Sequence, residues 1–143
     1  MSDEIGGKIK ALVFDVFGTV VDWRSSITRE IKSVGKRLGV EANWEAFADR
    51  WRAGYHDGMQ AFRDGTDVWK TADQMYRDRL DLLLAEHSIT SLSEPETEHL
   101  NRAWHRLDPW PEAVSGLSRL KSKFIISTLS NGSVALLTNM AKR

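Results

Sequence analysis

Two short runs of apolar residues lie near opposite ends of the chain, and the pattern between them is helical. Residues 11–17 (ALVFDVF) and 124–129 (FIISTL) are almost continuously apolar, and each run stops at small or polar residues. Runs of this kind are typical of strands buried on both faces of a parallel sheet. The sequence therefore predicts two parallel strands, one at each end of a long helical stretch.

Apolar residues that recur every three or four positions predict four helices between these strands. One stripe ends before Gly39, and a second begins after the cap residue Asn43. A third extends from about 67 to 86, and a fourth follows a capping box formed by Ser93 and Glu96. The middle of the chain is therefore expected to be almost entirely helical.

The segment DPWPEA, residues 108–113, follows the helices. Two prolines two positions apart predict a stiff, extended link, which we interpret as a hinge. Pro111 is expected to open another helix, and Ser133 to cap a last helix after the second strand. The resulting order is typical of an α/β fold with a helical insert after its first strand. Two strands alone leave open sheet edges, which indicates an incomplete version of a larger fold or strands borrowed from a partner.

Composition narrows the class of protein. Of 143 residues, 41% are hydrophobic and 28% are charged, as in folded globular chains. Lys plus Arg and Asp plus Glu both number 20, so no net field attracts nucleic acid or an anionic membrane. The chain has no Cys, which excludes disulfides and a thiolate nucleophile. With neither a signal peptide nor a membrane span in the sequence, we expect a cytoplasmic protein.

Polar residues follow both predicted strands. Asp15 ends the first apolar run and is followed by Gly18 and Thr19, while Ser130 and Asn131 follow the second run. Reactive pockets of open α/β sheets lie beyond the carboxyl ends of the strands, so these side chains are expected to converge if the strands are neighbours. The SNGS segment before the last helix also offers backbone N–H groups of the kind that bind anions.

Each of these residues also has a purely structural interpretation. Asp15 can cap the turn at Gly18, and Ser130 and Asn131 can cap the following helix. We favour a functional Asp15 because an acid at the end of an apolar strand, with a Gly and Thr pattern behind it, is typical of a reactive site. For Ser130 and Asn131 the residue types alone leave both interpretations open.

Two motifs point to a family. An Asp followed four positions later by Thr occurs in DVFGT, as Asp15 and Thr19, and a strand ending in Ser occurs in STLSNGS, with Ser130. They resemble the first two motifs of the haloacid dehalogenase superfamily. Its phosphatases carry a second Asp two residues after the first, where this chain has Phe17. With Arg52 in WRAGY and the SNG segment, the chain is similar to the L-2-haloacid dehalogenase (type II) subgroup.

The resemblance implies a fold and its domain limits. The expected fold is α/β, with a partial Rossmann-like parallel sheet core formed by residues 1–22 and 108–143. A helical cap domain, residues 23–107, is inserted after the first strand. The family's next two elements, a Lys that pairs with the nucleophile and an acidic loop, are expected beyond residue 143, since Lys142 follows Ser130 too soon. We therefore expect a C-terminal truncation and a chain that is weak or inactive by itself.

The resemblance also implies a reaction. A phenylalanine ring in place of the second Asp suits a leaving group that needs no proton, such as halide. The expected activity is hydrolytic dehalogenation of a short 2-haloacid through an ester intermediate on Asp15, with no metal and no cofactor. Roles follow for the other residues: Thr19 orients Asp15, Phe17 is a pocket wall, Ser130 binds the substrate carboxylate, and Arg52 and Asn131 hold the halide. Without the resemblance, Arg52 would be read as part of a solvated helix face.

Two other functions remain open at this point. A phosphate-handling hydrolase of the same superfamily is suggested by the SNGS segment and opposed by Phe17. A non-catalytic fragment or interaction module, whose sheet edge pairs with another chain, is suggested by the small number of strands. A 2-haloacid is the expected small-molecule partner, nucleic acid and membranes are not expected partners, and the sequence leaves a homodimer open.

Overall fold

The computed structural model describes residues 9–143, which form two compact units. The described part of the sheet unit comprises residues 9–23 and Asp108–Gly132, and the helical unit comprises Arg24–Leu107 and Ser133–Arg143. Residues 1–8 lie outside the described residues. The predicted absence of a signal peptide and the first part of the predicted sheet core fall on them. The domain limits from the sequence stay a prediction; these units differ from them by grouping Ser133–Arg143 with the helices.

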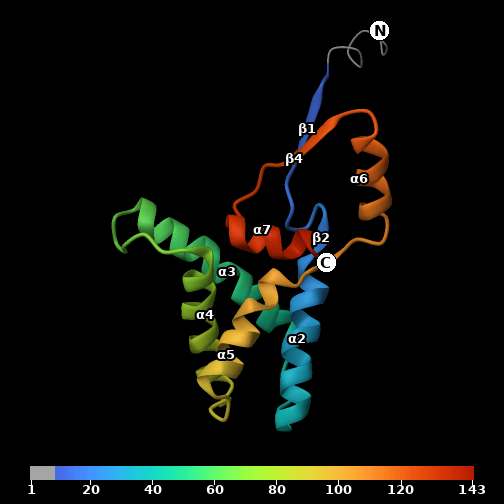
Figure 1. Ribbon diagram of the computed structural model, residues 1–143. Helices are drawn as coiled ribbons and strands as arrows, with labels where there is room; N and C mark the ends of the chain where they lie inside the picture. Colours follow the sequence, from blue (N-terminus) through green and yellow to red (C-terminus); the bar gives the residue numbers. More distant parts are fainter. Residues whose placement is uncertain (1–8) are drawn as a thin grey trace. The chain divides into compact units, whose positions relative to one another are not determined.

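The sheet unit is built on a parallel strand pair (Figure 1). Strand β1, Ala11–Phe14, pairs with β4, Ile125–Thr128, in a register that joins Ala11 to Ile125 and Phe14 to Thr128. Helix α6, Ala113–Lys121, packs against β4. The two predicted strands are therefore direct neighbours, as a crevice shared by their carboxyl ends requires.

The prediction that the strands are buried on both faces was wrong for these residues. The side chains of Val13 and Ile125 are 59% and 70% exposed. A parallel strand is buried on both faces only where other elements cover both faces, and among residues 9–143 this sheet has two strands. The first strand also ends at Phe14, three residues before the expected end, and the backbone then turns at Gly18, where φ is 90°.

A second, antiparallel strand pair joins the two segments that flank the helical insert. Strand β2, Val21–Asp22, pairs with β3, Asp108–Pro109. The backbone N–H of Trp110 then donates to the carbonyl of Val20 at 3.0 Å. The DPWPEA link is thus extended, as expected, and it is hydrogen-bonded to the segment before the insert. The helix after it begins at Ala113, two residues after Pro111.

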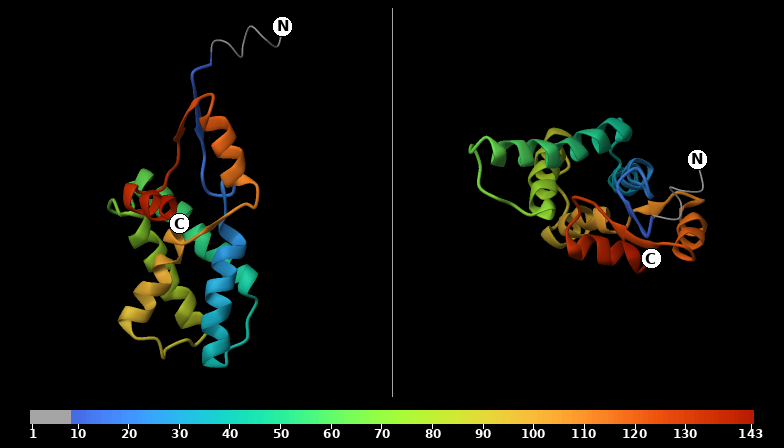
Figure 2. Two further views of the ribbon diagram at one scale, coloured as in Figure 1. Left: turned by 45° about the vertical axis from the view of Figure 1, so that its right-hand side comes forward. Right: turned by 90° about the horizontal axis from the view of Figure 1, so that it is seen from above.

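The helical unit contains the elements that the apolar stripes predict. Helices α3 and α4 lie side by side, and α5 packs on α4 (Figure 2). Its core is formed by large side chains that are almost fully buried, including Trp51, Trp104, Phe47 and Leu80. The elements are α2 (Trp23–Leu38), α3 (Trp44–Arg63), α4 (Ala72–Glu86), α5 (Glu94–Asn101), the 3-10 helix η1 (Arg102–His105) and α7 (Val134–Ala141).

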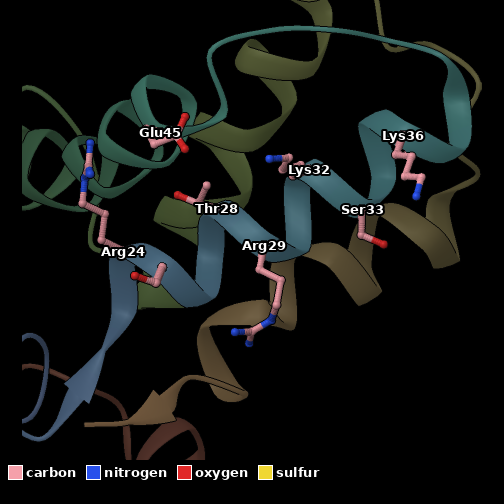
Figure 3. A pocket seen from close by; sticks show the side chains of 8 residues that line it. Arg24, Thr28, Arg29, Lys32, Ser33, Lys36 and Glu45 are labelled. Carbon is pink, nitrogen blue, oxygen red and sulfur yellow. The ribbon is translucent and has the colours of Figure 1, made fainter.

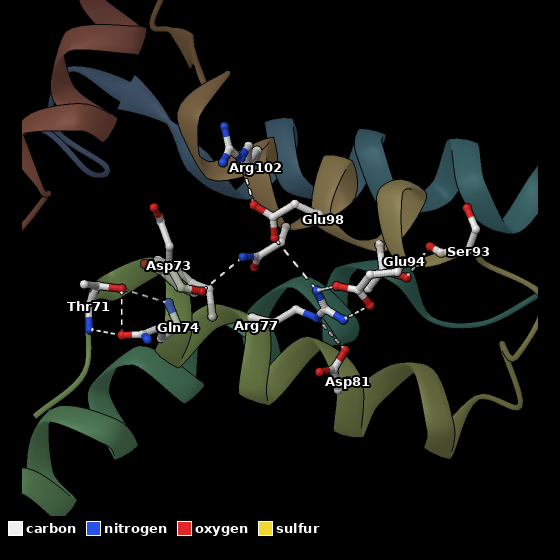
Figure 4. Close-up of polar contacts among 12 residues, drawn as sticks. Thr71, Asp73, Gln74, Arg77, Asp81, Ser93, Glu94, Glu98 and Arg102 are labelled. Carbon is white, nitrogen blue, oxygen red and sulfur yellow. Dashed lines mark hydrogen bonds and ion pairs between the residues drawn. The ribbon is translucent and has the colours of Figure 1, made fainter. Parts of the chain in front are cut away.

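Side-chain caps determine where these helices begin. The Asn43 side chain accepts a hydrogen bond from the Ala46 N–H at 2.9 Å, and Ser93 forms the predicted capping box with Glu96. The third helix begins at Ala72 and not near residue 67, because Thr71 and Gln74 form a capping box there (Figure 4). Its predicted start was therefore wrong by about one turn of helix.

Within residues 9–143, no helix combines the length and the apolar character needed to cross a lipid bilayer.

Candidate active site

Asp15 lies directly after β1, at the carboxyl end of the strand, and its side chain is exposed. The Thr19 hydroxyl donates a hydrogen bond to Asp15 Oδ2 at 3.2 Å. The loop that brings Thr19 back toward Asp15 is closed by the N–H groups of Val20 and Val21, which both donate to the carbonyl of Val16. The structure therefore brings together the two residues of the DVFGT motif and presents the carboxylate to solvent.

The polar residues after β4 lie at the same edge of the sheet. Pairing of the two strands extends one residue past β4, because the N–H of Leu129 donates to the carbonyl of Phe14 at 2.8 Å. Ser130 is the next residue, and its hydroxyl accepts from the N–H of Gly132 at 3.3 Å. Asn131 has an exposed side chain. The register thus places Asp15 and Ser130 one and two residues beyond the last paired residues of the two strands.

Phe17 and Gly18 form the turn that follows Asp15. Phe17 is partly buried and forms an isolated bridge with Val21. The Gly18 carbonyl accepts a hydrogen bond from the Trp110 indole Nε1 at 3.0 Å. From the sequence, Trp110 is expected only as part of the extended DPWPEA link. Its donor group instead fixes the loop that carries Phe17 and Thr19, a role that only the folded chain reveals.

Arg52 lies on α3, in the helical unit. Its neighbour Trp51 points into the core and is fully buried, while Arg52, one step round the helix, is half-buried. The Arg52 guanidinium donates a hydrogen bond from Nη1 to the Tyr76 hydroxyl oxygen. Its carbon Cζ lies 5.6 Å from the ring centroid of Tyr55 and 5.9 Å from that of Trp104. Arg52 is thus held among aromatic side chains and is not on a fully solvated face.

Tyr76 is the contact that the sequence did not reveal. Tyr76 lies within the third predicted apolar stripe, from about 67 to 86, and its ring is buried. Burial raises the pKa of the Tyr76 phenol, and the nearby Arg52 charge only partly opposes this. The phenol therefore stays protonated and neutral at neutral pH. A tyrosine in an otherwise aliphatic stripe was the available signal, because a buried phenol normally has a hydrogen-bond partner.

Five of the predicted site residues, Asp15, Phe17, Thr19, Ser130 and Asn131, belong to the sheet unit, and Arg52 belongs to the helical unit. Within the sheet unit, Asp15 and Thr19 are in contact, and Ser130 follows the neighbouring strand. The functional roles of all six stay predictions. Among residues 9–143, no group of three or more His, Asp and Glu side chains is suited to hold a metal ion.

A family model described as a haloacid dehalogenase-like hydrolase matches residues 9–143. The chain belongs to this family.

The chain is also similar to a named haloacid dehalogenase and to crystal structures of L-2-haloacid dehalogenases. The chain is 28% identical over 133 residues to (S)-2-haloacid dehalogenase 4A of Burkholderia cepacia, covering 90% of this chain and 53% of that protein. The crystal structure of the defluorinating L-2-haloacid dehalogenase Rha0230 superposes with a TM-score of 0.86 at 43% identity. That of the L-2-haloacid dehalogenase PA0810 superposes with a TM-score of 0.81 at 36% identity.

These similarities confirm the predicted fold class, an α/β fold with a Rossmann-like parallel sheet and an inserted helical cap, as in the L-2-haloacid dehalogenases. Both solved structures match 94% of this chain, which covers 56% of Rha0230 and 57% of PA0810. The chain thus spans about half the length of the family members that it matches.

A basic groove runs along α2 in the helical unit (Figure 3). It encloses about 600 Å³ and contains none of the predicted site residues. One of its cations, Arg24, forms a bidentate ion pair with Asp49, with both nitrogen to oxygen distances at 2.7 Å. We read the groove as a solvated helix face and not as the family's active site. Its charged lining residues are Arg24, Arg29, Lys32, Lys36 and Glu45.

Proposed function

We propose that this chain carries the nucleophile and the halide-binding side chains of a hydrolytic L-2-haloacid dehalogenase. The observation that carries the proposal is the Asp15 carboxylate, which is exposed at the carboxyl end of β1 and hydrogen-bonded by Thr19. An acid at this edge of a parallel sheet is in the position where α/β proteins bind and transform ligands. The names of the similar dehalogenases support a short 2-haloacid as the substrate.

The proposed reaction has two displacement steps at Asp15. In the first, a carboxylate oxygen attacks the carbon that bears the halogen, the carbon–halogen bond breaks, and halide departs with the bonding electrons. In the second, water attacks the carboxyl carbon of the resulting ester, and one of its protons goes to solvent while the other goes to the departing alkoxide oxygen. The ester bond breaks, so that a 2-hydroxyacid leaves and the Asp15 carboxylate is restored.

The remaining residues bind and orient the substrate in this proposal. Ser130 and the backbone amides of the loop after β4 bind the substrate carboxylate, and Thr19 orients Asp15. Phe17 supports halide as the leaving group, because an apolar ring cannot protonate a leaving alcohol as a second Asp would. Arg52 and Asn131 bind the departing halide. The homodimer and the cytoplasmic location stay predictions.

The apolar run before Asp15 also predicts a buried carboxyl, which would need a nearby cation to stay charged and would make the chain alone weakly active. That prediction is wrong, because Asp15 is exposed in the structure. The expectation that the chain alone has little activity stays a prediction, since it also rests on the Lys and the acidic loop that the resemblance implies.

A single-turnover experiment tests the ester intermediate even if turnover is slow. Protein in excess over (S)-2-chloropropionate is incubated in ¹⁸O-labelled water. Because the first hydroxyl oxygen comes from Asp15, the product is expected to be unlabelled, and the Asp15 peptide is expected to gain label. A labelled product from the first turnover would mean direct attack by water and would reject the mechanism.

The matched control is Asp15→Asn, which keeps the size of the side chain and removes the charged nucleophile. We expect it to abolish halide release, and persistent release would reject Asp15. An aryl phosphate with Mg²⁺ serves as the competing substrate. Hydrolysis of the phosphate ester in preference to the haloacid would favour the phosphate-handling alternative.

A further inference from the structure

The Tyr76 hydroxyl is bonded to the cation that the proposed function assigns to halide binding. A guanidinium has N–H donors and no acceptor, so the Tyr76 oxygen must be the acceptor in its hydrogen bond with Arg52. The contact joins α3 to α4, from residues 24 positions apart in the sequence. It is a charge-assisted hydrogen bond in a partly buried place, a kind that is stronger than one between neutral groups.

Tyr76 itself is fixed by two contacts and by its burial. Its ring stacks on Trp104 with centroids 4.1 Å apart and an interplanar angle of 10°. Its backbone carbonyl accepts a hydrogen bond from the Trp51 indole at 2.9 Å. The whole residue is 2% exposed. The phenol oxygen is therefore a stationary acceptor, whereas a free arginine side chain samples many rotamers.

Holding an arginine still has a direct effect on anion binding. An arginine that must be ordered when its ligand binds loses side-chain entropy at that moment, and this weakens the affinity. A guanidinium already held by Tyr76, between the rings of Tyr55 and Trp104, has lost much of that freedom before the anion arrives. The hydrogen bond to Tyr76 occupies one N–H group of Arg52 and restricts the orientation of its remaining N–H groups.

We propose that Tyr76 is a positioning residue for halide: its phenol oxygen holds the Arg52 guanidinium in the orientation that receives the departing anion. This inference rests on the halide-binding role proposed for Arg52. Tyr76 acts only through Arg52 and does not itself touch the substrate. The haloacid chemistry of Asp15 can be correct whether or not this inference holds.

Chloride binding to the 143-residue chain tests the proposal without any need for catalysis. Free chloride gives a narrow ³⁵Cl NMR signal that broadens in proportion to the fraction bound, and bromide should compete for the same site. Arg52→Ala is expected to abolish the broadening that bromide displaces. Tyr76→Phe keeps the ring and its stacking on Trp104, and is expected to weaken chloride binding roughly tenfold, the size expected for one lost hydrogen bond to a charged group.

The matched control is Tyr55→Phe, which removes the same hydroxyl from the neighbouring ring. The Tyr55 ring and its contact with the Arg52 guanidinium stay in place, so we expect chloride affinity within about twofold of the wild type. Thermal melts followed by circular dichroism check that both variants fold. An equal loss in the two variants would mean a general loosening of the cluster and would overturn the proposal.

The remaining outcomes separate the two proposals. If Arg52→Ala abolishes chloride binding and Tyr76→Phe leaves it unchanged, the positioning role is rejected and Arg52 is retained. If Arg52→Ala leaves chloride binding unchanged, the halide role of Arg52 fails, and the role of Tyr76 fails with it.

A measurement on the wild-type chain covers the case in which Tyr76→Phe does not fold. Slow rotation about the Nε–Cζ bond of Arg52 is expected to give separate ¹⁵N signals for its two Nη atoms. The exposed Arg63 on the same helix serves as the reference for a mobile guanidinium, with averaged signals. Averaged Nη signals from Arg52 would contradict the proposal.

Discussion

The helical unit buries more than half of its large apolar side chains, whereas the described sheet unit leaves most of its own partly or fully exposed. In the helical unit Trp51 and Trp104 are completely buried and pack edge to face with ring centroids 5.5 Å apart. In the described part of the sheet unit, Val16 and Val21 are the buried hydrophobic residues, while Leu129 is 71% exposed. Both units form regular secondary structure, but only the helical unit combines it with a core.

The difference shows what stabilises each kind of element. An amphipathic helix buries one stripe, so a few helices can cover one another's apolar faces. A parallel strand carries apolar residues on both faces and needs a cover on each. Most of the stabilisation from burial, at about 25 cal/mol per Å² of apolar surface, therefore comes from the helical unit. We expect this unit to dominate the unfolding behaviour of the 143-residue chain.

The largest expected effect is the loss of a core ring. Trp104→Ala is expected to lower the free energy of unfolding by about 3–5 kcal/mol, because it leaves a cavity under Tyr76 and Trp51. Leu129→Ala in the sheet unit is expected to change it by no more than about 0.5 kcal/mol. Urea unfolding followed by circular dichroism measures both. Similar losses from the two variants would remove the contrast between the units.

Two glycine substitutions test the contrast between the packed helical unit and the open sheet unit, because they are expected to change stability in opposite directions. A Cβ on Gly35 would lie 2.2 Å from the Trp44 ring, so Gly35→Ala is expected to destabilise the helical unit by about 1–3 kcal/mol. A Cβ on Gly116, in α6, meets no described atom within 4 Å. Gly116→Ala should therefore stabilise α6 by roughly 0.5–1 kcal/mol. Melting temperatures of the two variants should move in opposite directions, and a shift of the same sign in both would contradict the packing described here.

The smallest expected effect is a pH dependence confined to the helical unit. Hydrogen bonds from Arg77 lower the pKa of Glu94, and the side-chain hydrogen bonds from Arg24 lower that of Asp49 (Figure 4 shows the Arg77 contacts). A carboxyl whose pKa is lower in the folded state adds stability above its unfolded pKa and loses it as the pH falls through the folded value. Stability should therefore decline below about pH 4.5.

The matched variants for this pH effect are Glu94→Gln and Glu41→Gln. Both remove an exposed carboxylate, but only Glu94 is hydrogen-bonded to Arg77. The acid-induced fall in melting temperature is expected to be smaller in Glu94→Gln and unchanged in Glu41→Gln. An unchanged fall in Glu94→Gln would show that this ion pair contributes nothing measurable, as many exposed pairs do.

The features that the sequence predicted well are local ones. The caps at Asn43 and Ser93 depend on residues three positions apart, and the apolar stripes depend on one turn of helix. The DVFGT motif likewise predicted a contact within one loop, that of Thr19 with Asp15. In all these cases the interacting groups are close together in the chain, so a pattern of residue types is sufficient.

The features that the sequence could not predict depend on distant segments. Exposure of Val13 depends on what covers the sheet, which the strand's own residues do not specify. The hydrogen bonds of Tyr76 with Arg52 and of Trp110 with Gly18 join positions 24 and 92 residues apart. A search for apolar stripes counts tyrosine and tryptophan as apolar and ignores their hydrogen-bonding atoms. It therefore predicts that these side chains pack in the protein but does not predict these contacts.

The pairing of β2 with β3 has a consequence for how such a protein can diversify. The chain departs into the helical insert and returns from it on adjacent hydrogen-bonded strands, with Asp22 opposite Asp108. Inserts are tolerated where the two junctions lie close together, because a replacement then needs only to start and finish at neighbouring points. A lid of another size or shape can therefore be exchanged at this junction while the strand that carries Asp15 keeps its register.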